Sequence, residues 1–129
     1  MMRKVVLDAS ALLALLQQEK GAELVASTVK YALISTVNLT EVLTTLQKID
    51  ISSEEALEDI KALVGDIEPF SCGQADLAAC LNKRTRHLGL SLGDRACLAL
   101  ALDKGLPVFT ADKIWKELDI EDLKIQLIR

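Results

Sequence analysis

The amino-acid sequence predicts an α/β protein with a parallel sheet that is covered by helices on both faces. Short apolar runs alternate with longer helix-forming segments along the 129 residues, which is the pattern of such sheets. Half of the residues are apolar, so the chain can bury a core of its own. Because no repeat, low-complexity segment or Pro/Gly-rich linker divides them, residues 1–129 are expected to form a single domain.

The first part of the chain predicts two strands and three helices. Val5–Leu7 is a continuous apolar run, which fits a strand that is buried on both faces. Residues 9–18 and 22–30 have helical composition. A second strand is expected over residues 32–35, and a helix follows it from about residue 37 to 49.

The second part continues the alternation of helices and strands. Ser52 and Glu55 match the Ser-x-x-Glu capping box, so a helix is expected to follow to about residue 64. A weak strand over residues 67–70 contains Pro69, which indicates the edge of a sheet. The remaining expected elements are a helix over residues 74–87, a helix opening at 91–94 with a wholly apolar stretch at 96–102, a strand at 107–110, a short helix at 113–118 and a last strand near 124–127.

Composition argues against several classes of protein. The net charge of −4 disfavours a protein that binds nucleic acid by overall basicity. Only four residues are aromatic, which makes base-stacking platforms improbable. Charge is nevertheless uneven, because residues 83–116 carry seven basic and three acidic side chains, whereas residues 51–82 carry one and seven. A locally basic segment therefore lies within an acidic chain.

The cysteines and the apolar runs indicate in which cellular compartment the protein is expected. Three cysteines without CxxC spacing predict neither a disulfide framework nor a zinc site and suit a reducing cytosol. The uninterrupted apolar runs, such as residues 11–16, are too short to span a bilayer. No secretory leader is visible before the first strand. A soluble, cytoplasmic protein that does not enter a membrane is expected.

Four acidic residues follow elements of the expected sheet. Asp8 ends the first strand, and Asp112 comes just after the strand at residues 107–110. Glu41 lies about one turn into the helix after the second strand, and Asp94 lies in the first turn of the apolar helix. Ligands of parallel sheets bind beyond the carboxyl ends of the strands, so these carboxylates are expected to meet there. Several carboxylates in one cleft need a cation, and oxygen ligands favour Mg²⁺ or Mn²⁺, which catalyse phosphodiester hydrolysis.

Each acid also has a purely structural interpretation. Asp8 and Asp112 can cap the helices that follow them, and Ser91 with Asp94 matches a capping box with Asp in place of Glu. Taken singly, capping is the stronger interpretation for Asp94 and Asp112. Glu41 is harder to explain in this way, because it adjoins an apolar surface that includes Val37 and Val42 and has no cation near it in the helix.

Four segments together resemble the PIN-domain ribonucleases, and most of all the toxins of VapBC type II toxin–antitoxin systems. These segments are Val5–Leu12, Asn38–Val42, Ser91–Ala101 and Pro107–Asp112, in this order and at the usual spacings. The resemblance covers essentially the whole chain. It implies a three-layer α/β/α fold with a central parallel sheet and Mg²⁺- or Mn²⁺-dependent cleavage of RNA.

The resemblance also implies roles for individual residues. Asp8, Glu41, Asp94 and Asp112 match the catalytic, metal-binding acids of the family. Ser10 and Thr110 match the hydroxyl residues beside them, although hydrogen bonding at a helix start and a strand end explains both equally well. The expected partners are an RNA substrate, a cognate VapB-type antitoxin and a second copy of the chain in a homodimer.

Contacts to RNA are expected from the basic segment. Arg95, Lys113 and Lys116 adjoin Asp94 and Asp112 in the sequence, so they are the best candidates for binding phosphates. The alternative is that such residues form an ordinary solvated helix face.

Other functions fit less well or remain open. A response-regulator receiver domain needs an acidic pair after the first strand, and a haloacid-dehalogenase-like phosphatase needs Asp-x-Asp; Asp8-Ala9-Ser10 supplies neither. A housekeeping PIN-domain nuclease and a non-catalytic PIN-like binding module remain as alternatives to the toxin.

Overall fold

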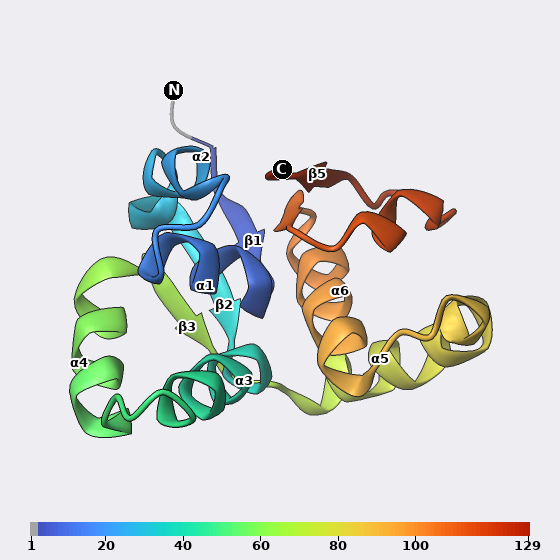
Figure 1. Cartoon of the computed structure of the whole chain (residues 1–129). Helices are drawn as coiled ribbons and strands as arrows, with labels where there is room; N and C mark the ends of the chain where they lie inside the picture. Colours follow the sequence, from blue (N-terminus) through green and yellow to red (C-terminus); the bar gives the residue numbers. More distant parts are fainter. Residues whose placement is uncertain (1–2) are drawn as a thin grey trace.

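Five parallel strands in the order β3-β2-β1-β4-β5 form the central sheet of the structure, a computed structural model that describes residues 3–129 (Figure 1). The strands are β1 (Val5–Leu7), β2 (Ala32–Ser35), β3 (Asp66–Glu68), β4 (Val108–Thr110) and β5 (Ile125–Leu127). The helices are α1 (Ala9–Leu16), α2 (Ala22–Ala26), α3 (Thr36–Gln47), α4 (Ser53–Leu63), α5 (Cys72–Thr85) and α6 (Leu92–Lys104), with the 3₁₀ helices η1 (Val29–Tyr31), η2 (Arg86–Leu88) and η3 (Lys113–Glu117).

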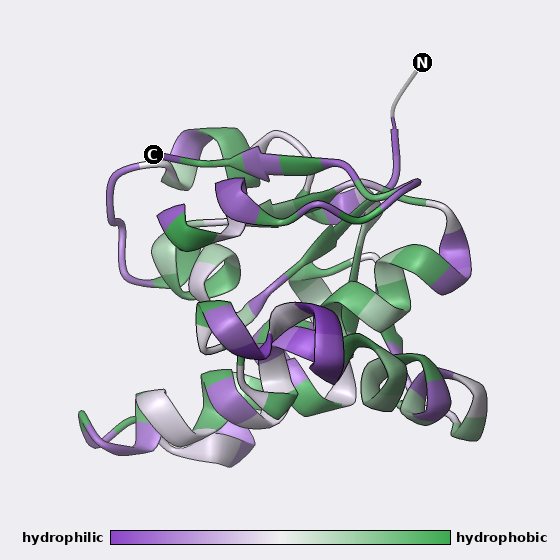
Figure 2. Cartoon of the chain, turned by 90° about the vertical axis from the view of Figure 1, so that its right-hand side faces the viewer, coloured by the Kyte–Doolittle hydropathy of each residue, from purple (hydrophilic) through white to green (hydrophobic). Residues whose placement is uncertain are grey.

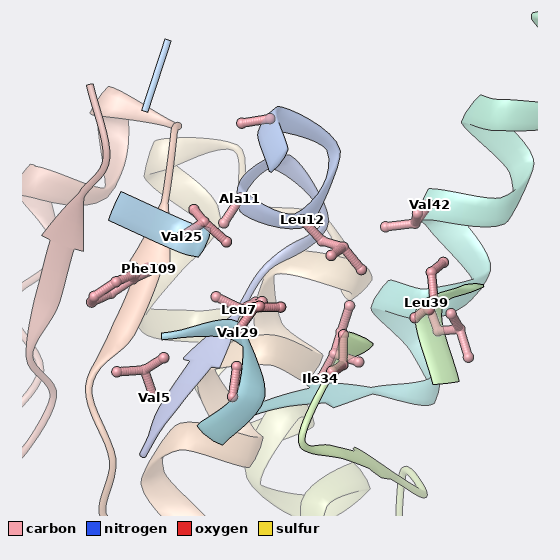
Figure 3. Close-up of a cluster of buried hydrophobic side chains, with 14 of the residues drawn as sticks. Val5, Leu7, Ala11, Leu12, Val25, Val29, Ile34, Leu39, Val42 and Phe109 are labelled. Carbon is pink, nitrogen blue, oxygen red and sulfur yellow. The ribbon is translucent and has the colours of Figure 1, made fainter. Parts of the chain in front are cut away.

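The residues of the central strands alternate between two separate cores. Val5 and Leu7 of β1 point into one core, in which Figure 3 shows them with side chains of α1 and α3, whereas Val6 points into the other. All three residues of β1 are buried, because helices cover both faces of the sheet. The expected three-layer α/β/α architecture is confirmed.

The two helical layers differ in composition. Helices α1, α2, α3 and α4 supply one core, whereas α6 lies against the other face with α5 packed on it. Between Ala96 and Leu102 helix α6 is apolar on all sides, and each residue from Ala96 to Ala101 is buried, as the sequence predicted, whereas Leu102 is partly buried. Figure 2 shows the apolar strands inside and the hydrophilic segments on the outer helices. The cores therefore fix α6 beside the sheet.

Most element boundaries agree with the sequence, and three details differ. The segments expected as single helices over residues 22–30 and 74–87 each divide, the first into α2 and η1 and the second into α5 and η2. Helix α4 begins at Ser53, but its N-cap Ser52 makes no side-chain capping bond, so that capping box does not form. Strand β3, which precedes Pro69, lies at the sheet edge as expected. Over residues 3–129, none of the helices has the length and apolarity needed to cross a bilayer.

The strand order places a topological switch between β1 and β4. From β1 the chain continues to β2 and β3 on one side, whereas β4 and β5 lie on the other side. Leu7 pairs with Phe109, so the chain leaves these two strands side by side, toward Asp8 and Thr110. Crevices at such switch points are where open α/β sheets bind ligands.

Candidate active site

Asp8 is the centre of a hydrogen-bond network at the end of β1. Its Oδ1 accepts bonds from the Ser10 hydroxyl (2.7 Å) and the Ala11 N–H (2.9 Å), and its Oδ2 accepts one from the Thr110 hydroxyl (2.6 Å). The Ala11 bond makes Asp8 the N-cap of α1, as the structural interpretation predicted. Capping therefore accounts for only one of the three bonds.

The two hydroxyl groups join the ends of β1 and β4. Ser10 Oγ accepts the Ala111 N–H (2.9 Å), and Thr110 Oγ1 accepts the Asp112 N–H (3.0 Å). Each hydroxyl thus accepts a hydrogen bond from a backbone N–H and donates one to the Asp8 carboxylate. Because all these groups lie at the ends of two neighbouring strands, the network fixes the Asp8 carboxylate relative to the segment that carries Asp112.

Burial makes the ionised form of Asp8 costly. The side chain is 5% exposed, and desolvation raises its pKa from 3.8 to about 6, although the hydrogen bonds from Thr110, Ser10 and Ala11 counteract the shift. The negative charge of Asp94 contributes a further small rise in this pKa. None of the hydrogen-bond donors to this carboxylate within residues 3–129 is a cation. The position therefore favours a positively charged ligand.

Asp94 and Asp112 cap helices, as expected for each taken singly. Asp94 Oδ2 accepts the Ser91 N–H (2.9 Å) while the Ser91 hydroxyl accepts the Asp94 N–H, which completes the capping box of α6. Asp112 Oδ1 accepts the Ile114 N–H (3.2 Å) at the start of η3. Each cap occupies one carboxylate oxygen and leaves the other without a protein donor among the described residues.

Glu41 is held by a residue for which sequence reasoning gave no role. The Asn38 amide donates to Glu41 Oε1 (2.8 Å) and to the carbonyl of Gly93 (3.0 Å), so it links α3 to α6. The Glu41 carboxylate lies directly against Gly93, where a Cβ would lie 2.6 Å from its Cδ. The spacing of Asn38 and Glu41 in one helix was a usable signal, but the contact with Gly93, 55 residues away, was not.

The buried thiol of Cys97 is affected by the charges of three of the four carboxylates. Cys97 is fully buried beneath this region, and its pKa is raised well above the usual value, first by desolvation and then by the negative charges of Asp8, Asp94 and Glu41. Three of the four predicted acids therefore lie near enough to this thiol to disfavour its ionised form. Asp112 is tied to them through its N–H and Thr110.

The four carboxylates have the oxygen ligands that a hard cation prefers, although they do not converge on one point. Within residues 3–129, no group of three or more Asp, Glu, His or Cys side chains is arranged to hold a metal ion. The chemistry nevertheless suits Mg²⁺ or Mn²⁺, since these carboxylates offer only oxygen atoms. Glu41 Oε2, Asp94 Oδ1 and Asp112 Oδ2 accept no hydrogen bond in the part of the chain that the structure describes, while each partner oxygen is fixed.

The three predicted RNA-binding residues differ in their surroundings. Lys113 and Lys116 are exposed on η3, directly after Asp112, and neither forms an ion pair with any described residue. Arg95 is half-buried, and its Nη1 donates to the Ala78 carbonyl of α5 (2.8 Å). Arg95 thus joins α5 to α6, and its contact with RNA stays a prediction.

The sequence belongs to a known family. The PIN domain matches residues 5–121, so the chain belongs to the PIN-domain family, whose members are generally nucleases. This confirms the family expected from the four sequence segments. The search of curated proteins found no match.

Solved structures share the fold over nearly the full chain. The crystal structure of VapBC2 from Rickettsia felis bound to a promoter DNA fragment gives a TM-score of 0.73 at 17% identity and covers 96% of this chain and 98% of that chain. DNA-bound VapBC from Salmonella typhimurium gives 0.72 at 15% identity, with 100% of both chains covered. FitAcB from Neisseria gonorrhoeae gives 0.70 at 17% identity, covering 94% of this chain and 95% of the other. At these identities the likeness establishes the fold.

Proposed function

We propose that the protein is a Mg²⁺- or Mn²⁺-dependent endoribonuclease that acts as the toxin of a VapBC-type toxin–antitoxin system. The observation that carries the proposal is the buried Asp8 carboxylate, which lies at the switch point of the sheet with no cationic side chain bonded to it among residues 3–129 and with Glu41 and Asp94 nearby. Membership of a family of nucleases gives the class of reaction.

The residues of the chain have separate tasks in this reaction. Asp8, Glu41, Asp94 and Asp112 hold the cation, which when bound activates water and neutralises charge on the phosphate. Ser10 and Thr110 orient Asp8 through the hydrogen bonds described above. Side chains that donate hydrogen bonds to a metal ligand, as these two do to Asp8, fix the direction of that ligand before the metal binds.

Substrate contact is assigned to the exposed cations beside Asp112. Lys113 and Lys116 are free to neutralise phosphates of an RNA strand that crosses the site. The only histidine, His87, is exposed in η2 and has no task in this reaction.

The proposed protein partners are a VapB-type antitoxin and a second copy of the chain. Several structures with the same fold are described as VapBC or toxin–antitoxin complexes, which supports the antitoxin. Co-expression with the product of a small adjacent gene, followed by affinity purification and light scattering, tests both the complex and the homodimer.

The catalytic proposal is tested with Asp8→Asn. We expect the wild type to cleave RNA only with Mg²⁺ or Mn²⁺, to leave 5′-phosphate ends and to inhibit growth, whereas the variant loses at least about a hundredfold of the rate because a buried cation ligand is removed. The matched control is Asp76→Asn, which alters an exposed acid on α5. Equal cleavage by wild type and Asp8→Asn contradicts the metal site, and cleavage without growth inhibition favours a housekeeping nuclease.

A further inference from the structure

Glu41 differs from the other acids in how it is held. Asp8 has three hydrogen-bond donors, and Asp94 and Asp112 are each fixed by a backbone N–H at a helix start. The carboxylate of Glu41 receives one hydrogen bond from the described part of the chain, and its donor is the side chain of Asn38. Its direction therefore depends on a single amide.

The chemistry of that amide fits the task closely. Both hydrogens of Asn38 Nδ2 are used, one by Glu41 Oε1 and one by the Gly93 carbonyl. Rotating the amide by 180° would place Oδ1 against two oxygen acceptors, so the two bonds fix its orientation. Asn38 is 1% exposed, and its Oδ1 has no partner among the described residues, which is a cost that a merely space-filling residue would not carry.

Gly93 provides the space into which Glu41 is turned. A Cβ at this position would lie nearest to Glu41 Oε2, 2.6 Å from Cδ and 2.7 Å from Oε1, closer than real Cβ contacts allow, so both carboxylate oxygens lie beside Gly93. The obstacle is the end of a flexible side chain, so a larger residue would displace the carboxylate and not the backbone. Gly93 lies in the first turn of α6 immediately before Asp94, and its carbonyl anchors Asn38.

We propose that Asn38 is a positioning residue that, with Gly93, holds the Glu41 carboxylate toward Asp94 so that Oε2 is presented to the cation. This inference rests on the proposed function for the identity of the ligand, whereas the contacts that hold Glu41 are made by residues of the chain alone. Asn38 and Glu41, spaced as Asn-x-x-Glu in α3, therefore act together in the site. The amide supplies two neutral hydrogen-bond donors, which neither Asp nor Ala supplies.

The metal-dependent test is a double-mutant cycle measured as Mn²⁺ affinity by calorimetry. Asn38→Leu keeps the volume of the side chain and removes both donors; we expect it to weaken Mn²⁺ binding about tenfold, the usual effect of losing such a partner. In the Glu41→Gln background the same substitution should change the affinity less than about twofold, because the group it positions has lost its charge. Equal losses in both backgrounds overturn the proposal.

Gly93→Ala gives a second variant that leaves Asn38 in place. We expect weaker Mn²⁺ binding together with unchanged or higher stability toward urea, since Ala is the better helix residue by about 1 kcal/mol. The control is Thr44→Val on α3, which removes an exposed hydroxyl bonded within its own helix (2.8 Å to the Thr40 carbonyl) and should not alter binding. Unchanged Mn²⁺ affinity in a folded Gly93→Ala protein contradicts the role of Gly93.

A metal-free measurement separates this inference from the proposed function. In EDTA, the ¹³C resonance of the Glu41 carboxyl carbon should shift in Asn38→Leu and Gly93→Ala but not in Thr44→Val. If the resonance is unmoved, the positioning role is wrong even when the wild type cleaves RNA. If the resonance shifts but the wild type neither binds Mn²⁺ nor cleaves RNA, the arrangement stands and the proposed function fails.

Discussion

At the scale of single residues, Asp8 stabilises the start of α1 but destabilises the folded protein through the burial of its charge. It caps α1, yet its burial raises its pKa to about 6. A folded-state pKa above the unfolded value of 3.8 means that the folded protein binds the extra proton between these values. The contribution of Asp8 to the free energy of unfolding is therefore expected to fall as the pH rises from about 4 to about 6 and to be constant above that range. The site is kept at a cost to stability, as functional sites often are.

This cost is expected to disappear in Asp8→Asn. Without metal at pH 7.5, the variant should be more stable than the wild type, by at most about 3 kcal/mol, which is the free energy equivalent of the raised pKa. The gain will be smaller than this limit because the new amide group faces the Thr110 hydroxyl. Urea unfolding in EDTA at pH 4.5 and 7.5 measures the difference, with Asp76→Asn as the control. A variant that is less stable than the wild type at pH 7.5 would show that capping and hydrogen bonding outweigh burial.

Thr110 is expected to affect the pH above which Asp8 is ionised and can bind a cation. Its hydroxyl bond lowers the pKa of Asp8, so Thr110→Val should raise that pKa further. Because a proton and a cation compete for the same carboxylate, the midpoint of Mn²⁺ binding against pH should move upward by about one unit. Calorimetric titrations between pH 5 and 8 test this, and Thr44→Val should leave the midpoint in place. A downward movement would contradict the assignment of the bond.

At the scale of elements, the sequence predicted most features that depend on neighbouring residues, although the capping box expected at Ser52 does not form. The apolar run of β1, the capping box of α6 and the wholly buried stretch of α6 are local patterns, and the structure confirms each. The contact of Asn38 with Gly93 depends on how α3 and α6 cross, which no local pattern records. The direction of Arg95 toward Ala78 was missed for the same reason. The acids were identifiable because they follow strand ends and helix starts, whereas their supporting groups were not.

The short helix η3 is expected to be the element that contacts RNA. Trp115 is fully buried and anchors η3, while Lys113 and Lys116 on the same helix are exposed. Replacing both lysines by Ala should weaken RNA binding and lower the slope of log affinity against log salt by about 1.4, since each phosphate contact to a single strand contributes about 0.7. Fluorescence anisotropy in EDTA, where no RNA is cut, measures this slope.

The control for that slope is Lys61→Ala, which removes an exposed lysine from α4 on the opposite helical layer. It should leave the slope unchanged. If Lys61→Ala and the double variant behave alike, RNA is attracted by the charge of the whole chain and not by η3.

At the scale of the whole molecule, an acidic protein can still act on RNA when its acids and its bases are separated. Four of the nineteen acids belong to the proposed site, and the remaining side chains sum to zero charge. The segment of residues 83–116 carries an excess of four positive charges and includes α6 and the first four residues of η3. Two bound divalent cations would neutralise the four acids, and the positive excess of this segment would then attract phosphate.

The stability of the whole chain should accordingly report cation binding. At a Mn²⁺ concentration one hundred times the dissociation constant, the folded state gains about 2.7 kcal/mol, which for a domain of this size raises Tm by about 10 °C. At pH 5, below the Asp8 pKa of about 6, a proton occupies the carboxylate and the rise in Tm should be much smaller. Differential scanning calorimetry at pH 5 and 7.5, with NaCl at matched ionic strength as the control, measures both values. Asp8→Asn should show no rise at either pH, and a rise that is equal at both pH values or retained in this variant would mean that the cation binds elsewhere on the molecule.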